Sequence, residues 1–103
     1  MKSSVTGRHV EVTSPIRRII DQKLETLERL LNDEAVSVQC VLSQAGHLCH
    51  TEVVLHVRGD HMFHGESEAV QWSLGIGGAV DKINQQVHTL KGKRDRRHRH
   101  DSR

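Results

Sequence analysis

The apolar residues of segment 16–31 repeat at the spacing of an α-helix, and this stripe constrains the fold more than any other feature. Just before it, Thr13-Ser14-Pro15 offers a hydroxyl to cap the first free amides and a proline suited to the first helical position. Charged and polar side chains fill the positions between the apolar ones. The segment therefore predicts an amphipathic helix that ends at residues 32–33 and buries one face against another layer.

The stretches after this helix change to a period of two, which is typical of half-buried strands. Turn signals at Ala45-Gly46 and Gly59-Asp60 separate them. The predicted strands are 35–44, 48–58 and 61–67, with a fainter first strand at about 2–8. In the first of the three later strands, one face is predicted to carry Val36, Val38, Cys40 and Leu42.

Helical spacing returns after Ala69 and predicts a second amphipathic helix that ends near Gly92. Its apolar stripe is Trp72, Ile76, Val80, Ile83, Val87 and Leu90. Gly75, Gly77 and Gly78 are unusual there, because each costs about 1 kcal/mol relative to alanine inside a helix. Either this helix begins later than its stripe, or the glycines let another backbone come close.

The resulting order, β-α-β-β-β-α, predicts an α+β fold of two layers. We expect a mostly antiparallel four-stranded sheet with both helices on one face. The 103 residues are enough for one core, so we expect a single domain at 1–93, monomeric when free. Residues 94–103 form a basic tail that we expect to be disordered in the free protein.

Positive charge is concentrated at the end of the sequence. Residues 91–103 hold seven basic and two acidic side chains, whereas the first ninety residues hold eight basic and eleven acidic ones. Segregation of this kind is typical of an arm that binds a polyanion. With only two aromatic residues, Phe63 and Trp72, the chain does not resemble domains that stack bases on several exposed rings.

Several functional classes are excluded by what the sequence lacks. No stretch is long and apolar enough for a membrane span, and the first residues do not resemble a secretion signal, so we expect a cytoplasmic protein without membrane partners. Cys40 and Cys49 are too few for a disulfide framework and are expected to be reduced. No nucleophile elbow, phosphate loop or metalloprotease motif is found, so we expect no enzyme, cofactor or small-molecule substrate.

Histidine and cysteine are frequent enough in the strand region to raise the question of zinc. The candidate ligands are His47, Cys49, His50, His56, His61 and His64. Their spacing matches no structural zinc motif. His50 and His56 are six residues apart, about 20 Å along an extended chain, and cannot hold one ion. We therefore predict no metal site and regard a small metalloenzyme as a remote alternative.

The basic residues favour contact with a phosphate backbone. Arg17 and Arg18 lie in the first turn of the first predicted helix, where the helix dipole disfavours cations, which suggests that an external anion binds there. Lys82 and Lys93 share a polar face of the second helix, and the arginine-rich tail extends the same charge. Such a surface recognises nucleic acid by charge and shape rather than by base identity.

Short motifs spread along most of the chain resemble those of the short bacterial ribosome hibernation factors, which include hibernation promoting factor and ribosome-associated factor Y. The matching segments are 5–13 (VTGRHVEVT), 41–43 (VLS), 55–57 (LHV), 65–68 (GESE) and 81–83 (DKI), with Arg17, Lys23, Leu27, Glu28, Lys91 and Lys93 between and after them. The chain departs from the family at the start of the second helix, where Ser73 and Gly77 replace a usual tyrosine and aspartate, and at Gln85.

The resemblance implies a fold similar to a double-stranded-RNA-binding domain. It also implies a non-enzymatic inhibitor that binds ribosomal RNA of the small subunit in the channel of messenger and transfer RNA. Idle ribosomes would then be held inactive, singly or as dimers, under stress or in stationary phase. The RNA contacts it implies are Arg17, Lys23, Lys82, Lys91 and Lys93, to which the charge pattern adds Arg94, Arg96 and Arg97.

A regulator of transcription that binds a protein through its open sheet face is the alternative. Val54 stands among His50, Glu52 and His56 on the expected open face, which gives that face little apolar area.

The basic tail favours the hibernation promoting subtype over factor Y, whose extension is acidic.

Overall fold

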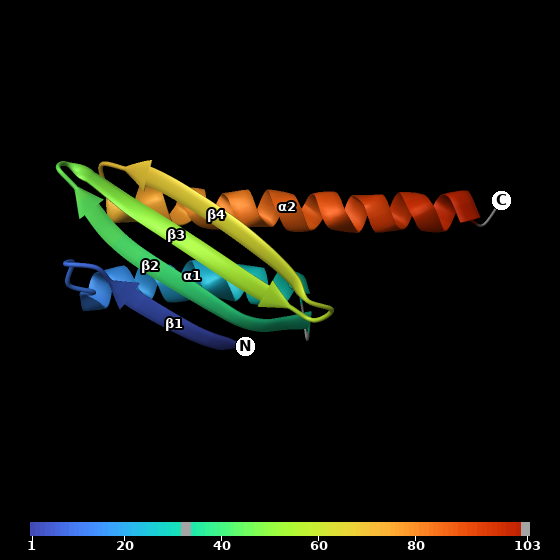
Figure 1. Ribbon diagram of the computed structural model, residues 1–103, viewed down its shortest axis with the longest axis horizontal. Helices are drawn as coiled ribbons and strands as arrows, with labels where there is room; N and C mark the ends of the chain where they lie inside the picture. The colour runs from blue at the N-terminus through green and yellow to red at the C-terminus, as the bar shows by residue number, and fades with distance from the viewer. Residues whose placement is uncertain (32–33, 102–103) are drawn as a thin grey trace.

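A computed structural model shows a sheet covered on one side by two helices (Figure 1). It describes residues 1–31 and 34–101, with side chains described for 1–31 and 34–89. The elements are β1 (Lys2–Gly7), α1 (Ser14–Leu31), β2 (Ala35–Ala45), β3 (Leu48–Val57), β4 (His61–Ala69) and α2 (Trp72–Asp101). The order β-α-β-β-β-α is confirmed. The predicted end of the first helix, at residues 32–33, lies outside the described residues.

The four strands follow each other in sequence order across the sheet. β1 runs parallel to β2, while the β2–β3 and β3–β4 pairs are antiparallel. The sheet is therefore mixed and mostly antiparallel, as predicted. The predicted turns are confirmed by positive φ angles of 61° at Gly46, 86° at Gly59 and 59° at Asp60.

The first helix is held at its start by the predicted cap. The backbone amide of Ile16 donates to the hydroxyl oxygen of Thr13 at 3.4 Å, and the amide of Arg17 donates to the Thr13 carbonyl. The apolar stripe faces the sheet and is buried at Ile16, Ile20, Leu24, Leu27 and Leu31. α1 thus begins where its cap begins and covers the sheet with its apolar face.

Replacing Thr13 with alanine is expected to destabilise the fold by about 1 kcal/mol, because an amide of the first turn loses its acceptor. Thr13→Ser keeps the hydroxyl and should retain most of the stability. Urea denaturation of the two variants checks this. Equal destabilisation by alanine and serine would contradict a capping role for the hydroxyl.

The alternation of the strands is confirmed in β3 and only partly in β2. Every second residue of β3 from Cys49 to Val57 is buried against the helices. In β2, Val38, Cys40 and Leu42 are buried, but Val36 is 44% exposed, so its predicted place on the buried face is wrong. The register shifts between Ala35 and Ser37, and this irregularity turns Val36 out of the alternation.

Two of the three glycines at the start of α2, Gly75 and Gly78, are explained by close packing, the second of the two alternatives. The helix begins at Trp72, before all three of them. A Cβ atom on Gly75 would lie 3.3 Å from the carbonyl oxygen of Cys49, and one on Gly78 would lie 3.1 Å from the Cβ atom of Ser67. The helix therefore approaches β3 and β4 more closely than side chains at these positions would allow.

The predicted end of the second helix, near Gly92, is wrong. α2 continues to Asp101. A single glycine weakens a helix by about 1 kcal/mol but does not have to end it, and the lysines and arginines around Gly92 have good helix propensity. The helix runs through the domain boundary expected at 93, and disorder of 94–103 in the free protein stays a prediction.

The core lies between the two helices and one face of the sheet (Figure 1). Its largest fully buried side chains include Ile20, Leu27, Leu42, Leu55, Ile76 and Ile83. Cys40 and Cys49 are buried and free, as predicted, and burial raises the pKa of the Cys40 thiol to about 11. The other face of the sheet has no helix on it within the described residues. None of the described helices is long and apolar enough to span a bilayer.

Candidate nucleic-acid interface

Arg17 and Arg18 lie where predicted, in the first turn of α1. Together with Val5 and Val12 they line a shallow groove of about 600 Å³ beside β1. Arg17 Nε lies 3.3 Å from Asp21 Oδ1, one helical turn further on. Such half-exposed pairs are worth little, so this contact leaves the guanidinium available to another anion.

Lys23 lies between the two helices. A Cβ atom added to Gly77 of α2 would lie 3.7 Å from Lys23 Cε and 3.9 Å from its amine. The Lys23 side chain therefore lies beside α2 at Gly77, at a distance that would also accommodate an alanine. Lys23 thus lies at the side of α2 that faces α1, whereas Lys82 lies at the side that faces β4.

Lys82 is exposed as predicted, but its amine already has a partner. It donates a hydrogen bond to the backbone carbonyl of Glu66, and Gln86 donates one at 2.8 Å to the carbonyl of His64. Both carbonyls belong to β4, the strand at one edge of the sheet. Lys82 therefore helps to hold α2 on the edge strand, a role that the sequence analysis missed because it depends on which strand lies beside the helix.

The remaining predicted contacts belong to the second half of α2. Lys91, Lys93, Arg94, Arg96 and Arg97 all fall within the helical range, but their side chains lie outside the description. Of the predicted set, Arg17 and Lys23 belong to α1 and Lys82 to the described part of α2, so these three lie in the helical layer. Whether the other five complete that surface stays a prediction.

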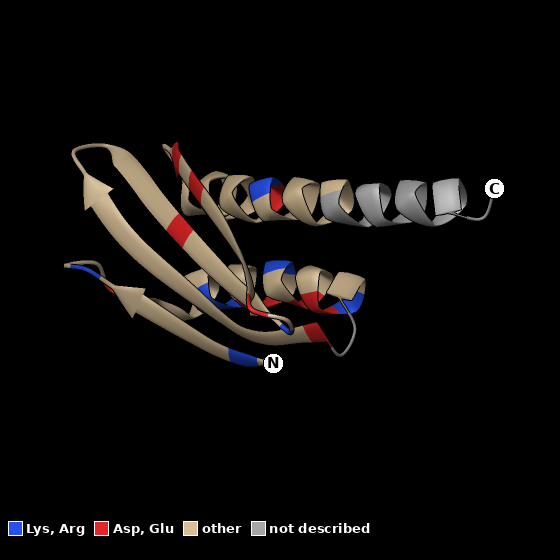
Figure 2. Cartoon of the chain, turned by 45° about the vertical axis from the view of Figure 1, so that its right-hand side comes forward, with Lys and Arg blue, Asp and Glu red and all other residues tan. Residues whose placement is uncertain are grey.

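Charge differs in sign between the helices and the strands. α2 contains seven lysines and arginines against three aspartates, and α1 contains four basic against three acidic residues. β2, β3 and β4 contain no lysine or arginine and three glutamates: Glu52, Glu66 and Glu68. Figure 2 shows both signs of charge on the two helices and acidic residues on the strands that follow α1. By composition the positive excess thus belongs to the helices, most of it to residues 91–101 of α2, whose side chains are not described, and the negative excess belongs to β2, β3 and β4.

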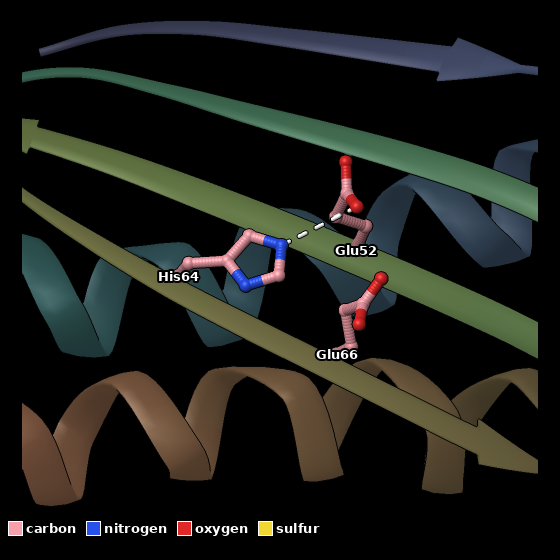
Figure 3. A group of neighbouring side chains, drawn as sticks. All are labelled: Glu52, His64 and Glu66. Carbon is pink, nitrogen blue, oxygen red and sulfur yellow. Dashed lines mark ion pairs between the residues drawn. The ribbon is translucent and has the colours of Figure 1, made fainter.

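The open face of the sheet carries a group of titratable side chains (Figure 3). His64 Nε2 lies 3.3 Å from Glu52 Oε2, and His50 Nε2 lies 3.6 Å from Glu66 Oε1. The hydrogen bond from His64 lowers the pKa of the Glu52 carboxyl. His50 and His64 were among the metal ligands considered from the sequence, whereas Glu52 and Glu66 were not.

The family described as "Sigma 54 modulation protein / S30EA ribosomal protein" matches residues 3–95. The ribosome hibernation promoting factor of Escherichia coli K12 is 28% identical over 94 residues, which cover 90% of this chain and 96% of that protein. The factor of the same name from Klebsiella oxytoca is 29% identical over 93 residues, with the same coverage.

Solved structures share the fold. The N-terminal domain of Protein Y from Thermus thermophilus is 30% identical, with a TM-score of 0.78 over 87% of this chain and 99% of that one. A ribosomal subunit interface protein from Coxiella burnetii has a TM-score of 0.81 over 89% of this chain and 99% of that one. At 15% identity this second likeness shows the fold alone.

Proposed function

The chain belongs to the Sigma 54 modulation protein / S30EA ribosomal protein family, and from this we propose that it is a ribosome hibernation factor. It binds ribosomal RNA of the small subunit in the channel that messenger and transfer RNA use. An idle ribosome with this channel filled cannot start translation, and no chemical step is needed. The protein acts as a monomer in the cytoplasm, and its relatives named ribosome hibernation promoting factor support the assignment.

The opposite charge of the two sides is the observation that carries this proposal. The helices are basic, whereas the three antiparallel strands carry glutamates and no lysine or arginine. In a channel lined by phosphates, the molecule would turn its helices toward the RNA and its open sheet face away from it. Charge thus supports binding in one orientation.

The two aromatic residues support contact with phosphates rather than with bases. Phe63 is buried in the core and Trp72 is partly buried against it. Neither offers a free ring on which a base could stack. Binding therefore depends on cations and on the shape of the helical surface.

Three kinds of contact are expected within this surface. Arg17 presents a guanidinium at the start of α1, and Lys23 presents an amine between the helices. Lys82 shares its amine between RNA and the β4 backbone, so its contribution is smaller than that of a free lysine. The largest contribution comes from the basic half of α2, with Lys91, Lys93, Arg94, Arg96 and Arg97.

Co-sedimentation with purified small subunits at increasing salt tests the proposal. Each phosphate neutralised by the protein releases counterions, so eight contacts predict a loss of affinity of roughly a thousandfold or more between about 50 and 200 mM salt. Binding that does not depend on salt would contradict the electrostatic mechanism. No binding even at low salt would refute the function, and capture of a single protein without ribosomes would favour the alternative of a protein-binding regulator.

A further inference from the structure

Glu52, His64 and Glu66 converge on the open face of the sheet, on the side opposite the helices (Figure 3). One donor atom from each of the three side chains lies within 4.8 Å of the other two. Glu52 and Glu66 are directly opposite each other in the β3–β4 pair, and His64 precedes Glu66 by two residues on β4. Two rigid strands therefore hold the three side chains on one side of the sheet.

The negative charges of Glu52 and Glu66 are only partly balanced by positively charged groups of the chain. Like charges at directly opposite positions of an antiparallel pair are destabilising. Among the residues whose side chains are described, the ion pairs of Glu52 and Glu66 are with His64 and His50 and not with a lysine or an arginine. Arg8, in the β1–α1 connection, has a minor influence on Glu52. Most of the negative charge is thus left without a full positive partner.

Glu66 is also oriented from outside the group. His50 Nε2 lies 3.6 Å from Glu66 Oε1, while His50 Nδ1 lies 3.3 Å from the hydroxyl oxygen of Ser43, its partner on β2. One ring nitrogen is thereby engaged by β2 and the other faces the carboxylate. Outer partners of this kind fix the direction in which a metal ligand points.

We propose that Glu52, His64 and Glu66 bind one divalent transition-metal ion, with Zn²⁺ as the best match. An imidazole nitrogen together with two carboxylates suits Zn²⁺, whereas Mg²⁺ and Ca²⁺ prefer ligand sets made of oxygen alone. Zinc binds nitrogen and oxygen at about 2.0–2.2 Å, so its ligand atoms lie roughly 3–4 Å apart. Rotation of these partly exposed side chains is enough to reach that spacing from 4.8 Å.

Binding of the ion would replace the contact between His64 and Glu52. In the free protein His64 Nε2 lies 3.3 Å from Glu52 Oε2. A neutral imidazole binds zinc through Nε2 when its single ring proton is on Nδ1, so a change of tautomer frees the nitrogen without a net loss of a proton. Three protein ligands leave at least one position to water, so the ion links β3 to β4 without being enclosed.

The linked strand is the one that holds Lys82. The side chain of Glu66 points into the proposed site, while its backbone carbonyl accepts the hydrogen bond from Lys82. An ion on the sheet face would therefore stiffen the strand on which α2 is anchored. The site does not depend on ribosome binding, because all its ligands lie on the side away from the helices.

Titration of the full chain, free of any affinity tag and of metal, with Zn²⁺ tests the site, followed by NMR of the histidine rings. The ring signals of His64 are expected to shift and to saturate at one equivalent bound there. His98 and His100 can also attract zinc, so the identity of the shifted ring is the readout rather than the number of ions. Zinc that shifts those rings while His64 stays unchanged would overturn the proposal.

Matched variants complete the test by calorimetry. His64→Ala and Glu66→Gln should each weaken binding at the strong site at least tenfold. His56→Ala is the control, because His56 lies on the same face of β3 but opposite Met62, four residues along the strand from Glu52. Equal loss in the control, or full affinity in the two ligand variants, would refute the assignment. Circular dichroism confirms that each variant is folded, and the NMR titration needs no variant.

Discussion

Replacing Lys91 and Lys93 together with glutamate is expected to lower the affinity for the small ribosomal subunit by roughly 100-fold or more. Each reversal exchanges an attraction to a phosphate for a repulsion, and a tenfold loss corresponds to about 1.4 kcal/mol. Lys82 is left unchanged, because its amine also bonds to the backbone of β4 and its loss would loosen the fold. Co-sedimentation at low salt measures the loss.

A second pair of charge-reversal substitutions distinguishes the effect of charge at the proposed binding surface from the effect of the net charge of the protein. Lys2→Glu together with Arg58→Glu changes the net charge by the same amount, but Lys2 belongs to β1 and Arg58 follows β3, and both are exposed and outside the helices. This control is expected to retain most of the affinity. An equal loss in both double variants would show that only the net charge matters, and would contradict a binding surface on the helices.

Replacing the same two lysines with glutamine gives a quantitative check. Each lost phosphate contact should reduce the slope of log affinity against log salt by about one, so the double variant should lose about two. An unchanged slope would mean that neither lysine contacts a phosphate. This measurement distinguishes direct contact between the lysines and phosphates from a general change in the electrostatic field of the protein.

The layers of this fold could be predicted because its periodicities are strong. The stripe of α1 and the alternation of β3 each have a single face that can be buried, so propensity and burial agree. The prediction that Val36 is buried was wrong, because a shift in register cannot be seen in the alternation of apolar residues. The prediction that the second helix ends near Gly92 was wrong, because a glycine between good helix formers weakens a helix without ending it.

The group on the open face could not be predicted because it depends on the register of one hairpin. A two-residue turn at Gly59-Asp60, as the sequence suggests, would place Glu52 opposite Ser67. The strands instead pair Val57 with His61, which includes Arg58 in the turn and brings Glu52 opposite Glu66. A slip of one residue moves every partner and every face, so the site follows from the turn and not from the residue types.

The close packing of α2 on the sheet has a different physical cause, which is the lack of side chains at facing glycines of the helix and of β4. Gly75 and Gly78 let the helix approach β3 and β4. On β4, Gly65 likewise has no side chain where the helix backbone comes close. A Cβ atom on Gly65 would lie 2.2 Å from the carbonyl oxygen of Ala79 and 3.1 Å from Ile83 Cγ1. The close approach is therefore built from both sides of the interface.

Gly65→Ala is expected to destabilise the protein by about 3 kcal/mol, because the oxygen that its methyl group meets belongs to a helix backbone and cannot rotate away. For a domain of this size, the melting temperature should fall by more than roughly 10 °C. Gly77→Ala is the matched control, since its methyl group would meet only Lys23, at 3.7 Å and 3.9 Å. Alanine there should stabilise α2 by up to about 1 kcal/mol. Thermal melts of the two variants measure both effects, and a harmless Gly65→Ala would show that α2 is not held against β4 at this distance.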